Sequence, residues 1–163
     1  MIITGKDIEF ENMIEGTIWQ GQYQPAGVDL SLQSVWEFET DGEIDGDNSK
    51  RRLAKAKQIL WDDEKPIKLK AGAYKIVFNE IVSIPPDAAA IARSRSSVLR
   101  CGASVQTAVW DPGYKGRSEA LLVVSNPHGL LVHKNAKVAQ LVFIRLEKKA
   151  ASTYSGKYQG ENI

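Results

Sequence analysis

Asp111 is the residue whose setting most directly suggests chemistry. It precedes a Pro-Gly pair in the stretch WDPGYKG (110–116), with Trp110 before it and Tyr114 shortly after. An Asp before Pro-Gly is a common turn opener whose carboxylate caps its own backbone. A turn can equally hold a carboxylate where it orients or deprotonates a water, beside aromatic rings that cover a sugar or a base. From the residues alone, both interpretations stand.

A second candidate site is the stretch RSRSSVLR (93–100). It predicts a short helix with a serine at its start and Gly102 just past its end. Hydroxyls and unpaired N–H groups at a helix start favour an anion. Arg95 and Arg100 would add fork-shaped contacts to phosphate oxygens. The alternative is an ordinary serine cap beside exposed arginines.

Asp29 and Gln140 stand among apolar neighbours, in PAGVDLSL and KVAQLVFI. A buried carboxylate is costly unless paired, so Asp29 either bonds an arginine or a backbone N–H, or helps hold a hydrated cation. The amide of Gln140 needs partners at both of its ends, and neighbouring backbone is the simplest supply.

The elements that must position these residues are mostly strands. Short alternating or apolar runs recur between turn signals spaced about ten residues apart, which predicts an all-β barrel or sandwich. Residues 28–38 alternate in the manner of a half-buried strand. Thr4 and Asp7 form a capping pattern that predicts a helix from Gly5 to about Ile14. The basic run from 50 to 57 suits a hairpin insertion or a short surface helix.

Composition excludes several classes of protein. With 163 residues, one domain is expected, and a net charge of +1 provides no broad basic field for nucleic acid. One cysteine and two histidines are too few for a thiolate–imidazole zinc site. No apolar run is long enough to span a membrane, so we expect a cytoplasmic protein. The polar, glycine-rich residues 151–163 cannot fold alone.

Taken together, the order and spacing of these stretches resemble the five motifs of the trimeric dUTPases and related dCTP deaminases, most closely the archaeal-type dUTPases. The matching stretches are GVDL (27–30), RSSVLR (95–100), AVWDPGYKG (108–116), KVAQLVF (137–143) and YSGKYQG (154–160). The resemblance implies a distorted, jelly-roll-like β-barrel of the β-clip type over residues 1–150, with one or two short helices. It also implies a homotrimer with shared active sites, closed by a flexible lid formed by residues 151–163.

The resemblance further assigns roles to individual residues. Asp111 would activate the water that attacks the α-phosphorus of dUTP, and Tyr114 would lie under the deoxyribose. Asp29 would hold waters on Mg²⁺ that the triphosphate carries. The pyrimidine would be read mainly by backbone groups of residues 105–110. The implied substrate-binding residues are Arg95, Ser96, Ser97, Arg100, Trp110, Tyr114, Gln140, Tyr154, Lys157, Tyr158 and Gln159.

Related deaminases carry a glutamate ten residues after the aspartate of the third motif, and here that position is Leu121. We therefore expect a dUTP diphosphatase. One alternative is a dCTP deaminase, or a bifunctional deaminase and dUTPase, in which a bulge brings Glu119 inward. Another is a trimer that binds a nucleotide without catalysis. Asn135 replaces the usual glycine of the fourth motif, so we expect it in a left-handed conformation.

Overall fold

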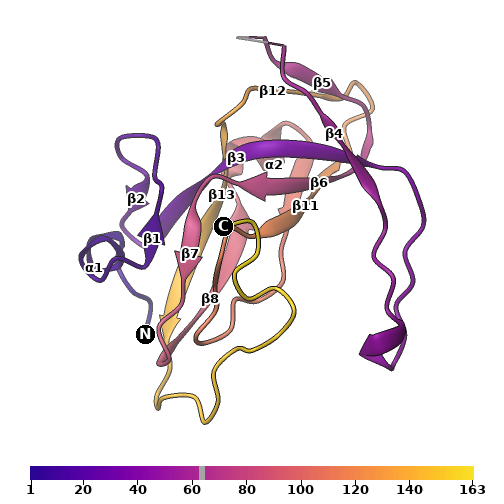
Figure 1. The fold of residues 1–163 in the computed structure, drawn as a ribbon. Coiled ribbons are helices and arrows are strands. Elements are labelled where there is room, and N and C mark those ends of the chain that lie inside the picture. The colour runs from indigo at the N-terminus through magenta and orange to yellow at the C-terminus, as the bar shows by residue number, and fades with distance from the viewer. Residues whose placement is uncertain (63–64) are drawn as a thin grey trace.

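The computed structural model describes residues 1–62 and 65–163, and it is mostly β (Figure 1). Among the described residues, no helix is long and apolar enough to cross a membrane. In chain order the elements are α1 (Gly5–Phe10), β1 (Ile14–Glu15), β2 (Tyr23–Gln24), β3 (Gly27–Phe38), the 3₁₀ helix η1 (Asn48–Lys50), β4 (Ala56–Ile59), β5 (Ile67–Leu69), β6 (Gly72–Phe78), β7 (Ile81–Ser83), β8 (Ala88–Ser94), α2 (Ser96–Arg100), β9 (Ala103–Gln106), β10 (Lys115–Gly116), β11 (Glu119–Val124), β12 (Leu130–Val132) and β13 (Lys137–Arg145).

The main sheet curves into a nearly closed antiparallel barrel. Its strands follow the order β8-β13-β3-β6-β11-β9, and β2 and β4 also pair with β3. At the open seam, the Ser94 hydroxyl of β8 accepts from Val105 N at 2.8 Å and donates to Val105 O at 3.2 Å. One side chain thus links the two end strands. Smaller sheets, β1-β7-β10 and β12-β5, flank the barrel. The expected all-β barrel with short helices is confirmed.

The barrel interior is a packed apolar core. Its largest fully buried side chains include Phe78 of β6, Phe143 of β13, Leu122 of β11 and Leu32 of β3. Each such side chain contributes about 1.5–3 kcal/mol on burial. Because the core comes from strands across the whole sheet, it fixes the positions at which the polar residues of these strands emerge.

The central strand β3 departs from the half-buried strand predicted for residues 28–38. Its first half is buried on both faces, and the polar residues Asp29 and Ser31 are 2% and 0% exposed. The alternation was real, but the polar face meets other polar side chains instead of water. The sequence pattern could not distinguish these two surroundings, because both place a polar residue at every second position.

The helix predictions hold in part. Thr4 caps α1, since its hydroxyl accepts from Asp7 N at 3.2 Å. The helix ends at Phe10 rather than near Ile14, because Asn12 takes a left-handed conformation with φ 52°. At α2 the N-cap is Arg95, with no side-chain capping bond, so the expected serine cap is wrong.

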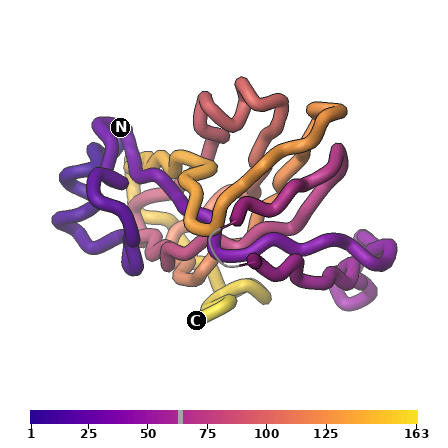
Figure 2. Tube along the Cα trace, turned by 90° about the horizontal axis from the view of Figure 1, so that it is seen from above, coloured from indigo at the N-terminus to yellow at the C-terminus, as the bar shows by residue number. Residues whose placement is uncertain are grey.

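The basic run belongs to a hairpin, which we call the arm (residues 38–56). Its base is the pairing of β4 with β3, from Val35 with Ile59 to Phe38 with Ala56. Further out, Glu43 and Arg52 form a bridge, and η1 lies near the tip. In Figure 1 and, seen from above, in Figure 2, the arm extends away from the barrel, at the right of the view. The hairpin interpretation is therefore the correct one.

Candidate active site

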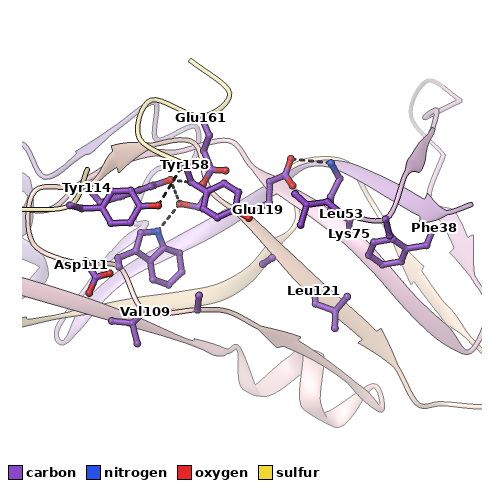
Figure 3. Close-up of a pocket in the computed structure, with 16 residues that line it drawn as sticks. Phe38, Leu53, Lys75, Val109, Asp111, Tyr114, Glu119, Leu121, Tyr158 and Glu161 are labelled. Atoms are coloured by element: carbon purple, nitrogen blue, oxygen red, sulfur yellow. Dashed lines mark hydrogen bonds and ion pairs between the residues drawn. The ribbon is translucent and has the colours of Figure 1, made fainter. Parts of the chain in front are cut away.

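An open cavity of about 580 Å³ lies between the arm, β11 and the C-terminal residues. Asp111, Trp110, Tyr114, Tyr154 and Tyr158, all named from the sequence, contribute to its wall. In Figure 3 Asp111 is at one end, and Phe38, Leu53 and Leu121 are at the other. The full lining is Phe38, Leu53, Ala54, Lys75, Ala108, Val109, Trp110, Asp111, Tyr114, Ser118, Glu119, Ala120, Leu121, Tyr154, Tyr158 and Glu161.

Asp111 is held by its backbone, which leaves the side chain available. Its carbonyl accepts from Tyr114 N at 3.1 Å, and Gly113, with φ 85°, donates its N–H to Ile84 O at 3.0 Å. The carboxylate is exposed and forms no hydrogen bond within the described part of the chain. The turn is therefore not capped by this carboxylate, and the turn presents the acid to solvent at the cavity.

A chain of hydrogen bonds lies behind this turn. Trp110 Nε1 donates to Ser118 Oγ at 2.6 Å, and Tyr114 Oη lies 2.9 Å from the same hydroxyl. Tyr114 donates its own proton to Glu161 Oε1 at 2.8 Å, so Ser118 must be the donor to Tyr114. Burial raises the pKa of Tyr114 well above its usual range, and burial also raises the pKa of Glu161. Nothing in the local sequence marked Ser118 or Glu161.

The C-terminal residues 152–162, which we call the tail, pack on the turn that carries Asp111. Tyr154 N donates to Pro112 O at 2.7 Å. The Tyr154 ring meets the Tyr114 ring edge-on at 5.7 Å. Gln159 accepts from Lys115 N and donates to Gly113 O, each at 3.1 Å. Of the predicted tail residues, Lys157 is exposed and does not line the cavity.

A second polar group surrounds the buried Asp29. Arg95 Nε lies 3.3 Å from Oδ1, Lys137 Nζ lies 3.6 Å from Oδ2, and Gln24 donates to Oδ2 at 3.3 Å. Gln140 is opposite Asp29 in the pairing of β13 with β3. The arginine partner was one of the outcomes expected for Asp29. Lys137 was missed, although it opens the KVAQLVF stretch.

The Asp111 cavity does not include the polar group around Asp29. None of the residues predicted to contact phosphate or metal lines the Asp111 cavity: Asp29, Arg95, Ser96, Ser97, Arg100 and Gln140. Ser96, Ser97 and Arg100 lie exposed on α2. Among the described residues, no group of three or more His, Cys, Asp or Glu is close enough to cage a metal ion.

Glu119 reaches the cavity without the bulge that the deaminase alternative invoked. The pairing of β11 with β6 runs without a register shift from Glu119 to Val124. Glu119 therefore shares a strand face with Leu121, and both line the cavity. Its carboxylate accepts from Lys75 Nζ at 3.0 Å, as drawn in Figure 3.

Glu80 is a buried carboxylate that the sequence did not reveal. Its two oxygens accept from Ser31 N at 2.9 Å, from the Ser31 hydroxyl at 2.5 Å and from Gln22 Nε2 at 2.7 Å. Gln22 also donates to Asp29 O at 2.8 Å. Burial raises the pKa of Glu80, although these donors act in the opposite direction. The network fixes the part of β3 that carries Asp29.

Comparison with known proteins is consistent with this arrangement. A model of the dCTP deaminase-like family matches residues 3–146. The chain belongs to this family. A relative from Methanosarcina acetivorans, named probable deoxyuridine 5'-triphosphate nucleotidohydrolase, is 49% identical over 86% of this chain and 82% of its own length. One of the same name from Aeropyrum pernix is 41% identical over the whole of both chains.

Solved structures share the fold of this family member at low sequence identity. The 2'-deoxycytidine 5'-triphosphate deaminase from Agrobacterium tumefaciens has a TM-score of 0.65 and 18% identity, over 87% of this chain and 47% of that one. The EIAV dUTPase has a TM-score of 0.55 and 15% identity, over 88% of this chain and 96% of that one. At such identities the likeness concerns the barrel alone.

Proposed function

We propose that this protein is a dUTP diphosphatase, which hydrolyses dUTP to dUMP and pyrophosphate. The observation that carries the proposal is the Asp111 carboxylate, exposed at the end of an aromatic cavity and unbonded within the described residues. The protein's family membership and the names of its relatives support a nucleotide substrate and this type of hydrolysis.

The cavity suits a deoxynucleoside. Tyr114 is 6% exposed and its hydroxyl is bonded to Ser118 and Glu161, so the ring cannot easily move aside. A rigid ring beneath the sugar would leave no room for a ribose 2′-hydroxyl. The pyrimidine would extend along residues 105–110 towards Leu121, and its polar edge would bond to backbone groups. In this pose Tyr158 would cover the base, while the α-phosphate would lie beside Asp111.

Asp111 would position a water in line with the α-phosphorus and accept its proton as the oxygen–phosphorus bond forms. The bond between the α-phosphorus and the oxygen that bridges it to the β-phosphorus then breaks, and pyrophosphate leaves. Placement of a base of this kind contributes about 10²- to 10⁴-fold in rate. The accumulating negative charge would be balanced by Arg95, assisted by Lys137, Gln140 and the hydroxyls of α2.

The residues around Asp29 fit a magnesium ion only through water. Two of the side chains that touch Asp29 are cationic, and these favour the phosphates over a bare metal ion. The carboxylate has more lone pairs than partners, so it can still accept from water bound to a metal. Mg²⁺ that arrives with the triphosphate would supply charge neutralisation there.

We propose that the protein acts as a homotrimer. The cationic group around Asp29 does not line the base-binding cavity of the same chain, and a neighbouring copy would bring the two together. Exposed apolar side chains near both groups support such contacts: Ile91 is 40%, Leu99 56% and Val109 58% exposed. The tail would then act as a lid that excludes water from the completed site.

Glu119 gives a second candidate function, deamination of dCTP, because its carboxylate lines the cavity on the same face as Leu121. A glutamate in this place could move a proton at the pyrimidine ring. Its carboxylate already accepts from Lys75 Nζ at 3.0 Å, so it would have to leave this partner to act on the ring.

One assay separates these activities. The protein is incubated with dUTP, dCTP or dTTP and Mg²⁺, and pyrophosphate and ammonia are measured. We expect pyrophosphate from dUTP and no ammonia. Ammonia from dCTP would establish the deaminase, and its loss in Glu119→Gln would assign it to that residue. Binding of dUTP without any product would mean a non-catalytic nucleotide-binding protein.

A further inference from the structure

The arm contributes to the cavity although no sequence motif pointed to it. Phe38, Leu53 and Ala54 line the end of the cavity away from Asp111 (Figure 3). The arm is held in register at its base by β4, and further out by the bond from Lys55 N to the Thr40 hydroxyl at 2.9 Å. Its inner side is therefore a defined wall of the cavity.

Two neighbouring arginines on the arm have different surroundings. Arg52 pairs with Asp41 at 3.2 Å and with Glu43 at 3.9 Å, and all three side chains are more than half exposed. Arg51 instead turns to the tail, where its guanidinium carbon lies 5.7 Å from the centre of the Tyr158 ring. Its Nε is buried and has no hydrogen-bond partner among the described residues. A cation at this distance is attracted by the ring.

The other bonds of the tail run to the segment that follows Asp111. Tyr154, Gln159, Gly160 and Glu161 bond to residues within 112–117. These bonds hold the tail on one side of the cavity. The contact between Arg51 and Tyr158 adds a second attachment, which runs to the arm. Tyr158 itself lies beside Tyr114 and Glu161 (Figure 3). The tail is therefore attached both to the segment after Asp111 and to the arm, while its Tyr154, Tyr158 and Glu161 line the cavity.

We propose that Arg51 is a positioning residue that holds the tail closed over the cavity by its contact with Tyr158. The arm would thus be a working part of the lid as well as a wall. Closure itself does not depend on which nucleotide binds; only the kinetic consequence rests on the proposed dUTP hydrolysis.

Closure can be measured without any substrate. A lysine-specific protease that cuts after Lys157 releases the peptide 158–163, and its release follows the fraction of molecules with an open tail. Arg51→Ala leaves every lysine in place. We expect release to become about two- to thirty-fold faster, the range that a cation–π contact contributes. An unchanged rate would overturn the proposal.

Matched variants identify the contact. Arg52→Ala, the same change at the next residue, should release the peptide at the wild-type rate. Tyr158→Phe keeps the ring and should also match it, whereas Tyr158→Leu should release the peptide faster. If the two residues act on each other, Arg51→Ala should add little in the Tyr158→Leu background. Additive effects, or equal effects of Arg51→Ala and Arg52→Ala, would contradict the proposal.

If the protein hydrolyses dUTP, Arg51→Ala should raise KM by no more than the factor found for peptide release, because binding falls with the closed fraction. The kcat at saturating dUTP should change less than KM. A fall in kcat with an unchanged KM would contradict a positioning role. Absence of turnover in the wild type would instead reject the proposed hydrolysis, and the protease result would stand by itself.

Discussion

At the scale of single residues, the side chain of Asp111 takes no part in forming the turn that carries it. The backbone of residues 111–114, with Gly113 in a left-handed conformation, forms the turn, so the carboxylate does not cap it. We therefore expect Asp111→Asn to preserve the fold and dUTP binding while turnover falls about 10²- to 10⁴-fold, since the base is lost. Pyrophosphate release would measure turnover, and calorimetry would measure dUTP binding, with Asp45→Asn on the exposed arm as the control. Unchanged turnover would exclude Asp111 as the base.

Tyr114 offers a second test at this scale. Tyr114→Phe keeps the ring but removes the proton given to Glu161 and the acceptor used by Ser118. Because both partners are buried or half-buried, we expect a loss of about 1–3 kcal/mol in the free energy of unfolding. Urea unfolding would measure it. Tyr74→Phe, which loses one bond to Lys70 O, should lose less. An equal loss in the two variants would mean that the hydrogen-bond chain adds nothing.

At the scale of elements, β3 links the core to the site through Glu80. Since burial raises the folded-state pKa of Glu80, the folded protein binds this proton more tightly than the unfolded chain. The contribution of Glu80 to the free energy of unfolding is therefore fully present below the ordinary glutamate pKa. It is lost as pH rises through the raised pKa of the folded state. We expect unfolding free energies, measured at a series of pH values, to fall more with rising pH in the wild type than in Glu80→Gln. Parallel curves for the wild type and Glu80→Gln would refute this.

The elements also show which features could be predicted from the sequence. Strand patterns, turn residues and the Thr4 cap were readable because they are local, and Asn135 takes the expected left-handed conformation, with φ 64°. The contacts of Glu80 with Ser31 and of Arg51 with Tyr158 join residues far apart in the chain. Neither residue type nor spacing could reveal them. The buried polar face of β3 was misjudged for the same reason, since what covers a strand face is set by the tertiary fold.

At the scale of the whole molecule, the proposed trimer divides each site between chains. Asp111→Asn and Arg95→Ala should each inactivate the protein alone. After joint unfolding and refolding of an equal mixture, about a quarter of the sites should receive an intact Asp111 from one chain and an intact Arg95 from its neighbour. Recovery of activity near that level, together with a trimer mass by light scattering, would support shared sites. No recovery in a confirmed mixed trimer would place both residues in one chain's site.

The position of β13 has a consequence for how the chain is made. This strand lies between β8 and β3 in the sheet, yet it is the last strand of the chain, and Ile144 also bridges Ile2 at the beginning. During synthesis, β3 and β8 therefore expose edges that find their partner only when residues 137–145 leave the ribosome. Contacts of such long range slow folding, and uncovered strand edges attract other chains. We therefore expect a nascent chain of this protein to be most prone to aggregation before residues 137–145 emerge.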